Sequence, residues 1–263
     1  MANNDILVLG ATGTTGRRVV AQLRERGAGV RAASRSGEVR FDWDEPSTWE
    51  QAVEGARRLY LMAPDGQAVA EDFVRLAVDS GVRRVVLLSS QGIEVMGDQR
   101  LLEAERVVEA AGAEWVVVRP DWFNQNFDAG FLRPAVDAGV VALPVGDVRQ
   151  AFIDADDIAA VAVAGLLEDG HAGETLVISG PRALSFGEAL GEIGRATGRE
   201  IRFAGEPDDY RAAMSFQDDA EIEGAIAAFR ALAEQGDAAP TDTVERVTGR
   251  PPKDFATYVA ESW

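Results

Sequence analysis

Short apolar runs of strand length alternate along this chain with longer segments in which apolar residues recur at helical spacing. This alternation is typical of a parallel sheet that is covered by helices on both faces. Six apolar runs predict strands at residues 5–11, 29–34, 39–43, 57–63, 83–90 and 114–120. The helical segments between them lie at residues 14–27, 47–55, 67–81 and 98–112. We therefore predict an α/β fold built on a Rossmann-type, doubly wound parallel sheet.

The pattern becomes less regular after residue 120, where aromatic, amide, glycine and proline residues are mixed. Short strands are predicted at residues 150–155 and 174–179, helices at 157–168 and 186–197, and a largely helical tail beyond 206. We expect a dinucleotide-binding domain over residues 1–150. Residues 151–263 are expected to complete the sheet and to form a smaller C-terminal α/β lobe on the substrate side.

Composition narrows the possible functions. The formal net charge of −18 repels phosphate backbones, so we expect no nucleic-acid partner. The absence of cysteine excludes disulfides, thiolate metal sites and cysteine nucleophiles, and we expect no metal. No apolar run reaches the length of a membrane span, and the first residues do not resemble a secretory signal. We therefore expect a cytoplasmic protein without a membrane partner.

The most informative stretch is GATGTTG, which places Gly10, Gly13 and Gly16 between the first predicted strand and helix. This is the context of a dinucleotide-binding fingerprint. Gly10 would permit the tight turn, Gly13 the approach of a pyrophosphate, and Gly16 close packing of helix on strand. Free N–H groups at the helix start would face the anion. The alternative is a glycine-rich turn without a ligand. The same loop supplies three further candidate cofactor contacts, Thr12, Thr14 and Thr15.

The second predicted strand ends at Ser34 and is followed by Arg35. An NAD-binding protein would place an acidic residue here, on the ribose 2′-hydroxyl. Arginine can instead stack on adenine and pair with a 2′-phosphate, so we predict NADP(H) as the cofactor. Such a charge-assisted contact contributes about 1.5–3 kcal/mol. A surface arginine is the alternative.

Three more candidate cofactor contacts lie at strand ends. Asp42 follows the third strand and could meet the adenine edge, although a turn-forming aspartate is the alternative. Ala63 and Pro64 end the fourth strand, where the cofactor's ribose is expected to pass.

Beyond the glycine loop, several segments resemble the NmrA-like branch of the atypical short-chain dehydrogenases/reductases. This branch includes triphenylmethane reductase-type and NADPH:quinone oxidoreductase-type proteins. The matching segments run in order along nearly the whole chain, at residues 8–16, 85–92, 107–127, 152–166, 173–201 and 247–259. The resemblance implies NADP(H) binding and a C-terminal lobe that closes over the substrate. It leaves activity open, because the branch holds both reductases and redox-sensing regulators.

The resemblance also implies a set of site residues. Ser89, Ser90 and Gln91 would lie beside the nicotinamide, and residues 120–127 would form a loop over it and the substrate. Ser89 and Pro120 are then candidate cofactor contacts. The candidate catalytic residues are Ser90, Gln91 and Asn124. The candidate substrate contacts are Trp122, Phe123 and Phe127, for which hydrophobic packing is the alternative.

The Tyr-x-x-x-Lys pair of the best-known short-chain dehydrogenases is missing, because no tyrosine or lysine lies between Gln91 and Trp115. The sole lysine, Lys253, is predicted to be a surface residue, and the sole histidine, His171, a turn residue. Hydride transfer needs no protein acid when the product anion is already stable, provided that the reactants are aligned.

These observations favour an NADP(H)-binding oxidoreductase that transfers hydride to a conjugated, quinone-like or aromatic small molecule. Two alternatives stay open. One is a non-catalytic NADP(H)-sensing regulator that acts on a protein partner, and the other is a redox-neutral biosynthetic enzyme on the same fold. Either a monomer or a homodimer is compatible with the sequence.

Overall fold

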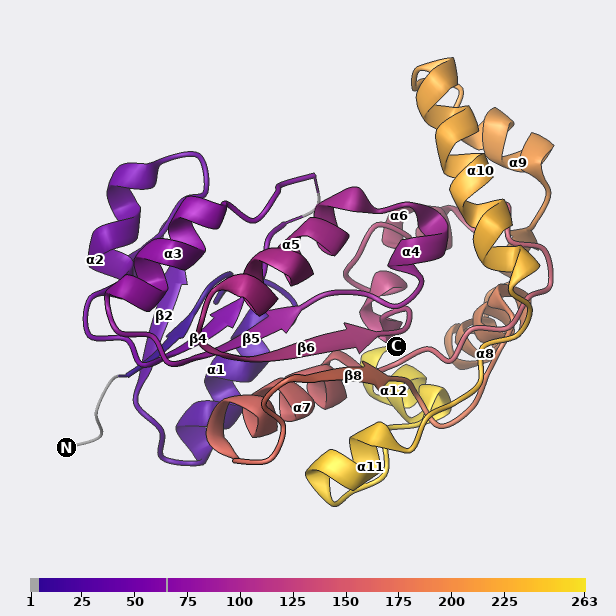
Figure 1. Cartoon of the computed structure of the whole chain (residues 1–263). Coiled ribbons are helices and arrows are strands. Elements are labelled where there is room, and N and C mark those ends of the chain that lie inside the picture. Colours follow the sequence, from indigo (N-terminus) through magenta and orange to yellow (C-terminus); the bar gives the residue numbers. More distant parts are fainter. Residues whose placement is uncertain (1–4, 65) are drawn as a thin grey trace.

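The computed structural model describes residues 5–64 and 66–263 of the chain. Its main body is a seven-stranded sheet with the order β3-β2-β1-β4-β5-β6-β8, in which every neighbouring pair is parallel (Figure 1). The strands are β1 Ile6–Val8, β2 Val30–Ser34, β3 Val39–Arg40, β4 Arg58–Leu61, β5 Arg84–Leu88, β6 Glu114–Pro120 and β8 Glu174–Ile178. The strand order reverses between β1 and β4, so the predicted Rossmann-type, doubly wound sheet is confirmed.

Each face of the sheet has its own helical layer and its own core. Ile6 and Val8 pack into one core, whereas Leu7 and Leu9 pack into the other, because successive side chains of a strand point to opposite faces. Burial on both faces explains the uninterrupted apolar run. One layer contains α1 Gly16–Glu25, α7 Ala155–Leu167 and α11 Thr243–Thr248. The other contains α2 Trp49–Val53, α3 Glu71–Asp79 and α5 Gln99–Ala110.

A second region lies beyond the carboxyl ends of the strands (Figure 1). It holds a small parallel sheet of two strands, β7 Val140–Ala142 and β9 Arg202–Ala204. The helices α6 Arg133–Ala138, α8 Phe186–Thr197 and α12 Phe255–Ser262 share a separate core with it. The helices α9 Pro207–Ala213 and α10 Asp219–Glu234 form an arm that projects from the body (Figure 1). The short helix α4 Ile93–Met96 follows β5 and packs against α10.

Some predicted elements are wrong in detail. Residues 150–155 form no strand and make only isolated bridges, Gln150 to Leu184 and Phe123 to Ile153, because this segment crosses between the two regions. The third strand is short because a turn begins at Asp42. The strands β7 and β9 were not expected.

The C-terminal part of the chain contributes to both regions. Helix α7, strand β8 and helix α11 return to the main sheet, as Figure 1 shows, whereas β9 and the remaining helices build the second region. The domain boundary expected at residue 150 and the substrate-side role of residues 151–263 stay predictions. Among residues 5–64 and 66–263, no helix combines the length and apolarity that a membrane crossing requires.

Candidate functional site

The glycine loop joins β1 to α1 by a turn that requires glycine at two positions. Gly10 has a φ of 62°, and a Cβ there would lie 2.5 Å from the Sδ atom of Met62. A Cβ on Gly16 would lie 2.2 Å from the carbonyl oxygen of Gly10. Gly10 therefore supplies a left-handed backbone conformation, and Gly16 allows the start of α1 to touch the end of β1.

The backbone of this loop leaves amide groups free at the start of α1. The N–H of Gly13 donates to the carbonyl oxygen of Gly10 at 2.8 Å. Within the described chain, the N–H groups of Thr12, Thr14 and Thr15 donate to no protein acceptor. Free amides at a helix N-terminus, reinforced by the helix dipole, form an anion-binding site that suits a pyrophosphate.

Thr15 also has a structural contact. The hydroxyl group of Tyr60, on β4, donates to the Oγ1 atom of Thr15 at 3.0 Å beneath the loop. Tyr60 is fully buried, and burial raises the pKa of its hydroxyl group well above the ordinary value. This tyrosine therefore stays neutral and supports the loop from below.

The predicted adenine-binding residues lie at the ends of β2 and β3. Ser34 is buried, and its Oγ atom has no hydrogen-bond partner within the described residues. Arg35 is exposed and takes part in no ion pair of the described chain. The Oδ1 atom of Asp42 accepts the N–H of Asp44 at 3.1 Å, so the turn-forming role applies to that oxygen.

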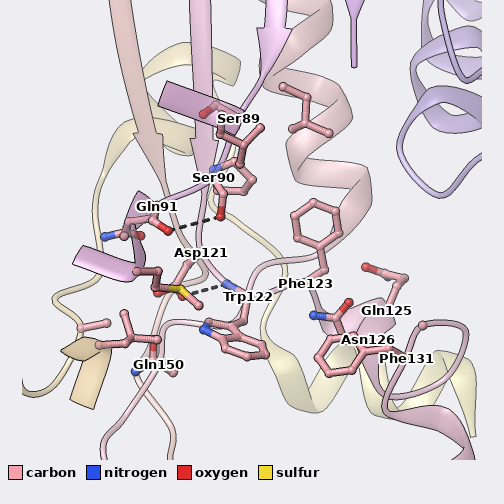
Figure 2. A pocket seen from close by; sticks show the side chains of 18 of the residues that line it. Ser89, Ser90, Gln91, Asp121, Trp122, Phe123, Gln125, Asn126, Phe131 and Gln150 are labelled. Carbon is pink, nitrogen blue, oxygen red and sulfur yellow. Dashed lines mark hydrogen bonds between the residues drawn. The ribbon is translucent and has the colours of Figure 1, made fainter. Parts of the chain in front are cut away.

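A cavity of about 930 Å³ opens at the carboxyl ends of β4, β5 and β6 (Figure 2). Such an edge, next to the point where the strand order reverses, is where open α/β sheets bind ligands. The cavity brings together ten of the predicted site residues: Thr14, Thr15, Ala63, Pro64, Ser89, Ser90, Gln91, Pro120, Trp122 and Phe123. Gly10, Thr12, Gly13, Gly16, Ser34, Arg35 and Asp42 lie outside its lining, towards the pyrophosphate and adenine end of the predicted cofactor site.

A buried ion-pair network holds the turn after β5. The Oγ atom of Ser89 donates to Glu105 on α5, and Glu105 accepts two hydrogen bonds from Arg119 on β6, at 2.5 and 2.8 Å. Arg119 also donates to Glu94 at 2.7 Å. The bonds that Arg119 donates to Glu105, followed by the one to Glu94, raise the pKa of Arg119. The hydroxyl group of Ser89 therefore donates its hydrogen bond within the protein and not to a ligand.

The two residues after Ser89 have fewer contacts. The Oγ atom of Ser90 donates to the carbonyl oxygen of Gln91 at 3.2 Å (Figure 2). The Oε1 atom of Gln91 is buried without a partner within the described chain. Both side chains line the cavity and keep hydrogen-bonding capacity for a ligand.

Asp121 is a buried lining residue that the sequence analysis missed. Its two carboxylate oxygens accept the N–H groups of Trp122 at 2.7 Å and Ala151 at 2.9 Å (the first bond is drawn in Figure 2). Burial raises the pKa of Asp121 despite these two bonds. The carboxyl group thus ties the loop after β6 to the crossing segment. The sequence did contain a signal for this residue, because Asp121 is an acidic residue directly after a predicted strand.

The wall opposite the glycine loop is aromatic and comes from three separate segments. The ring of Trp122 lies 6.2 Å from that of Phe131 and 6.1 Å from that of Phe229, the latter nearly parallel to it (Trp122 and Phe131 are labelled in Figure 2). Phe229 and Leu232 belong to α10, and residues 235–239 continue the wall. No local pattern indicates the contact between Trp122 and Phe229, because these positions lie about a hundred residues apart in the chain.

Of the residues predicted for catalysis or substrate contact, Asn124 and Phe127 do not line the cavity. Phe127 is fully buried, with its ring 5.3 Å from Phe152 and 5.5 Å from Phe255, so it belongs to the aromatic core of the second region. Asn124 is also fully buried, and neither atom of its amide group has a partner within the described chain. The structure therefore does not support direct contact of Asn124 or Phe127 with a substrate, because packing closes both side chains off.

Lys253 is not the surface residue that the sequence predicts. Its Nζ atom lies 2.9 Å from Glu261, 3.2 Å from Asp156 and 3.6 Å from Asp154. Asp156 also accepts a hydrogen bond from Arg18 at 2.7 Å. This network links α1, which starts at the glycine loop, to the C-terminal helix. Within the described residues, no group of three or more His, Cys, Asp or Glu side chains is arranged to hold a metal ion.

Comparisons with known proteins agree with this geometry. Residues 10–169 match a family model described as NAD(P)H-binding. The chain is 31% identical to the NAD(P)H azoreductase of Xenophilus azovorans, over 96% of each chain. It is also 31% identical to the (4-alkanoyl-5-oxo-2,5-dihydrofuran-3-yl)methyl phosphate reductase of Streptomyces griseus, over 97% of each chain. The NADPH-dependent quinone oxidoreductase of Escherichia coli, solved with NADPH, has the same fold, with a TM-score of 0.78 and 19% identity over 97% of this chain and 99% of that one.

Proposed function

Because the chain belongs to the NAD(P)H-binding family, we propose that it is an NADPH-dependent reductase that transfers hydride to a conjugated or quinone-like small molecule. One observation carries the proposal. A single cavity is lined by Thr14 and Thr15 of the glycine loop, by Ser90 and Gln91 after β5, and by the aromatic wall of Trp122. A nicotinamide and an aromatic acceptor can therefore meet beside Ser90 and Gln91.

The residues present fit a dinucleotide. The free amides of Thr12, Thr14 and Thr15 suit the pyrophosphate, and the missing side chain of Gly16 brings them to the strand end. Arg35 has no carboxylate partner in the described chain, which leaves its guanidinium for a 2′-phosphate. When bound, the reduced cofactor supplies the hydride.

The lining favours acceptors that need no acid from the protein. Among the described residues that line the cavity there is no tyrosine, lysine or histidine. The one buried carboxyl group, Asp121, is held by two backbone N–H groups. Quinones, enones and similar conjugated acceptors give stable anions after hydride transfer and can take a proton from water. The contribution of the protein is then alignment, together with hydrogen bonds from Ser90 and Gln91 to the developing charge.

The relatives support this acceptor class. They are named for the reduction of azo compounds, of quinones and of an oxo-dihydrofuran phosphate, and each of these acceptors is conjugated. This similarity favours a reductase over the regulatory and redox-neutral alternatives.

The test is NADPH oxidation by the purified protein against a panel of quinones, enones, azo dyes and cationic dyes. We expect turnover faster than the reaction in free solution, with a higher KM in Trp122→Ala. The matched control is Phe216→Ala, because Phe216 is an exposed aromatic residue outside the cavity. Tight binding of both cofactor forms without turnover would instead indicate a regulator. Failure to bind either cofactor would indicate a redox-neutral enzyme.

A further inference from the structure

The cavity contains one basic side chain among its described lining residues, Arg100 in the first turn of α5. Apolar side chains lie along the same cavity, including those of Met62, Met96 and Leu101. Of the two acidic lining residues, Asp121 is held by backbone N–H groups, and Asp237 accepts the N–H of Arg149 at 2.9 Å at the exposed rim. Neither carboxylate is paired with Arg100.

The contacts of Arg100 with the described protein are weak. Its guanidinium lies 3.4 Å from the carbonyl oxygen of Gln67 and 3.3 Å from the Oδ2 atom of Asp98, and both distances exceed the usual range for N–H···O bonds. The other carboxylate oxygen of Asp98 caps α5 by accepting the N–H of Leu101 at 3.1 Å. Arg119, by contrast, makes three bonds of 2.5 to 2.8 Å to carboxylates.

Arg100 therefore keeps most of its five N–H donors available at the cavity. Its side chain is only 22% exposed, so water satisfies it incompletely. A planar guanidinium in this situation matches the oxygen atoms of a carboxylate, phosphate or sulfonate. Its position in the first turn of α5 adds the favourable field of the helix N-terminus.

We propose that Arg100 binds an acidic group on the acceptor, so that the site selects anionic conjugated molecules over neutral and cationic ones. The apolar side chains beside Arg100 would receive the conjugated body of the same molecule. This inference rests on the proposed function, because it concerns the substrate of the same site. A local cation is needed for such a substrate, since the protein as a whole carries a net charge of −18 and repels anions.

The experiment compares two quinones that differ in charge, menadione and 1,4-naphthoquinone-2-sulfonate. With the wild-type protein we expect a lower KM for the sulfonate. Arg100→Gln is expected to raise that KM about 10- to 100-fold, the effect of one lost charge-assisted contact, and to leave kcat and the KM for menadione unchanged. Arg100→Lys keeps the charge without the planar donor pair and should recover part of the loss.

The matched control is Arg106→Gln. Arg106 lies on the same helix but is exposed and paired with Glu103 at 3.1 Å, outside the cavity. The Arg106→Gln substitution should leave the KM values for both quinones unchanged. If the wild-type protein and Arg100→Gln show the same preference between the two quinones, the proposal is overturned, while the proposed reductase function stands.

Calorimetry distinguishes whether Arg100 binds an acidic group of the acceptor or a phosphate group of the cofactor. The Kd for NADPH should be the same in the wild-type protein and in Arg100→Gln. A weaker Kd in the variant would mean that Arg100 binds a cofactor phosphate, and would overturn the assignment to the acceptor. If neither quinone is reduced, the preference is measured by binding instead of by turnover. Binding of the sulfonate to the NADP⁺ complex then still tests Arg100, because loss of binding in Arg100→Gln supports the inference and equal binding refutes it.

Discussion

A Cβ atom on residue 16 would lie 2.2 Å from the carbonyl oxygen of Gly10, so Gly10 and Gly16 together set the distance between the end of β1 and the start of α1. The obstacle is backbone, which cannot move aside as a flexible side chain can. The free amides of the loop therefore keep their position only while residue 16 has no side chain.

Gly16→Ala should consequently lower both stability and cofactor affinity. Overpacking of this kind costs about 1–3 kcal/mol. Urea unfolding and NADPH titration measure the two effects. The control is Gly224→Ala in α10, where a Cβ would meet nothing within 4 Å, and where alanine should be neutral or stabilise by up to about 1 kcal/mol. Equal stability and affinity in Gly16→Ala and the wild-type protein would disprove the close-approach argument.

Glu105→Ala should destabilise the protein strongly. The side chain of Glu105 is only 8% exposed, and it accepts bonds from Ser89 and Arg119. Removing one partner of a buried ion pair costs about 3–5 kcal/mol, and Arg119 would keep only the more exposed Glu94 as a carboxylate partner. Glu94→Ala removes the other carboxylate on Arg119, but this residue is 53% exposed, so a cost of about 0–1 kcal/mol is expected. Equal unfolding free energies for the two variants would argue against the network as a support of the Ser89 turn.

Arg35→Asp should move the cofactor preference from NADPH towards NADH. The substitution removes the guanidinium and places a carboxylate where it can accept the ribose 2′-hydroxyl. We expect the Kd for NADPH to rise about 10- to 100-fold. Arg75→Asp is the control, because Arg75 is also exposed but lies on α3 and outside the cavity. An unchanged Kd for NADPH in Arg35→Asp would remove the assignment of Arg35 to the 2′-phosphate.

Lys253 should titrate at unusually high pH. Burial lowers its pKa, but Glu261, Asp154 and Asp156 outweigh this effect and raise the pKa to about 12. Because the pKa is higher in the folded state than the unfolded value of about 10.4, its contribution to stability is complete below pH 10.4 and is lost as the pH rises through 12.

The titration of Lys253 can be followed directly, since it is the only lysine. Protein labelled with ¹⁵N in lysine alone gives a single Nζ signal, whose midpoint should lie near 12 in the folded protein and near the ordinary value in urea. Asp156→Asn should lower the folded midpoint. A folded midpoint at the ordinary value would show that the carboxylates do not hold the ammonium group.

The fold could be predicted from local features of the chain. Strands that are buried on both faces appear as continuous apolar runs, as in residues 5–11 and 114–120. The glycine loop was equally predictable, because Gly10 is needed for a positive φ and the contact that requires Gly16 lies within seven residues of chain. Helix α8 was predicted with the observed bounds, and its capping box, formed by Ser185 and Glu188, is also local.

The cavity lining was predictable only in part. Trp122 and Phe127 lie five residues apart in one loop and have the same aromatic character in the sequence. Packing against Phe152 and Phe255 buries Phe127, whereas Trp122 lines the cavity beside Phe131 and Phe229. Asn124, in the same loop, is also fully buried.

The sequence by itself determined the parallel sheet, the anion-binding turn and the class of cofactor, because each of these depends on periodicity or on neighbours in the chain. The tertiary structure alone decided which side chains line the cavity. Phe229, Arg100 and Asp121 meet in one cavity from α10, α5 and the end of β6, and Lys253 lies half-buried among carboxylates at the start of α7 and in α12. Such contacts depend on how distant segments pack, and packing between distant segments leaves no periodic signal in the chain.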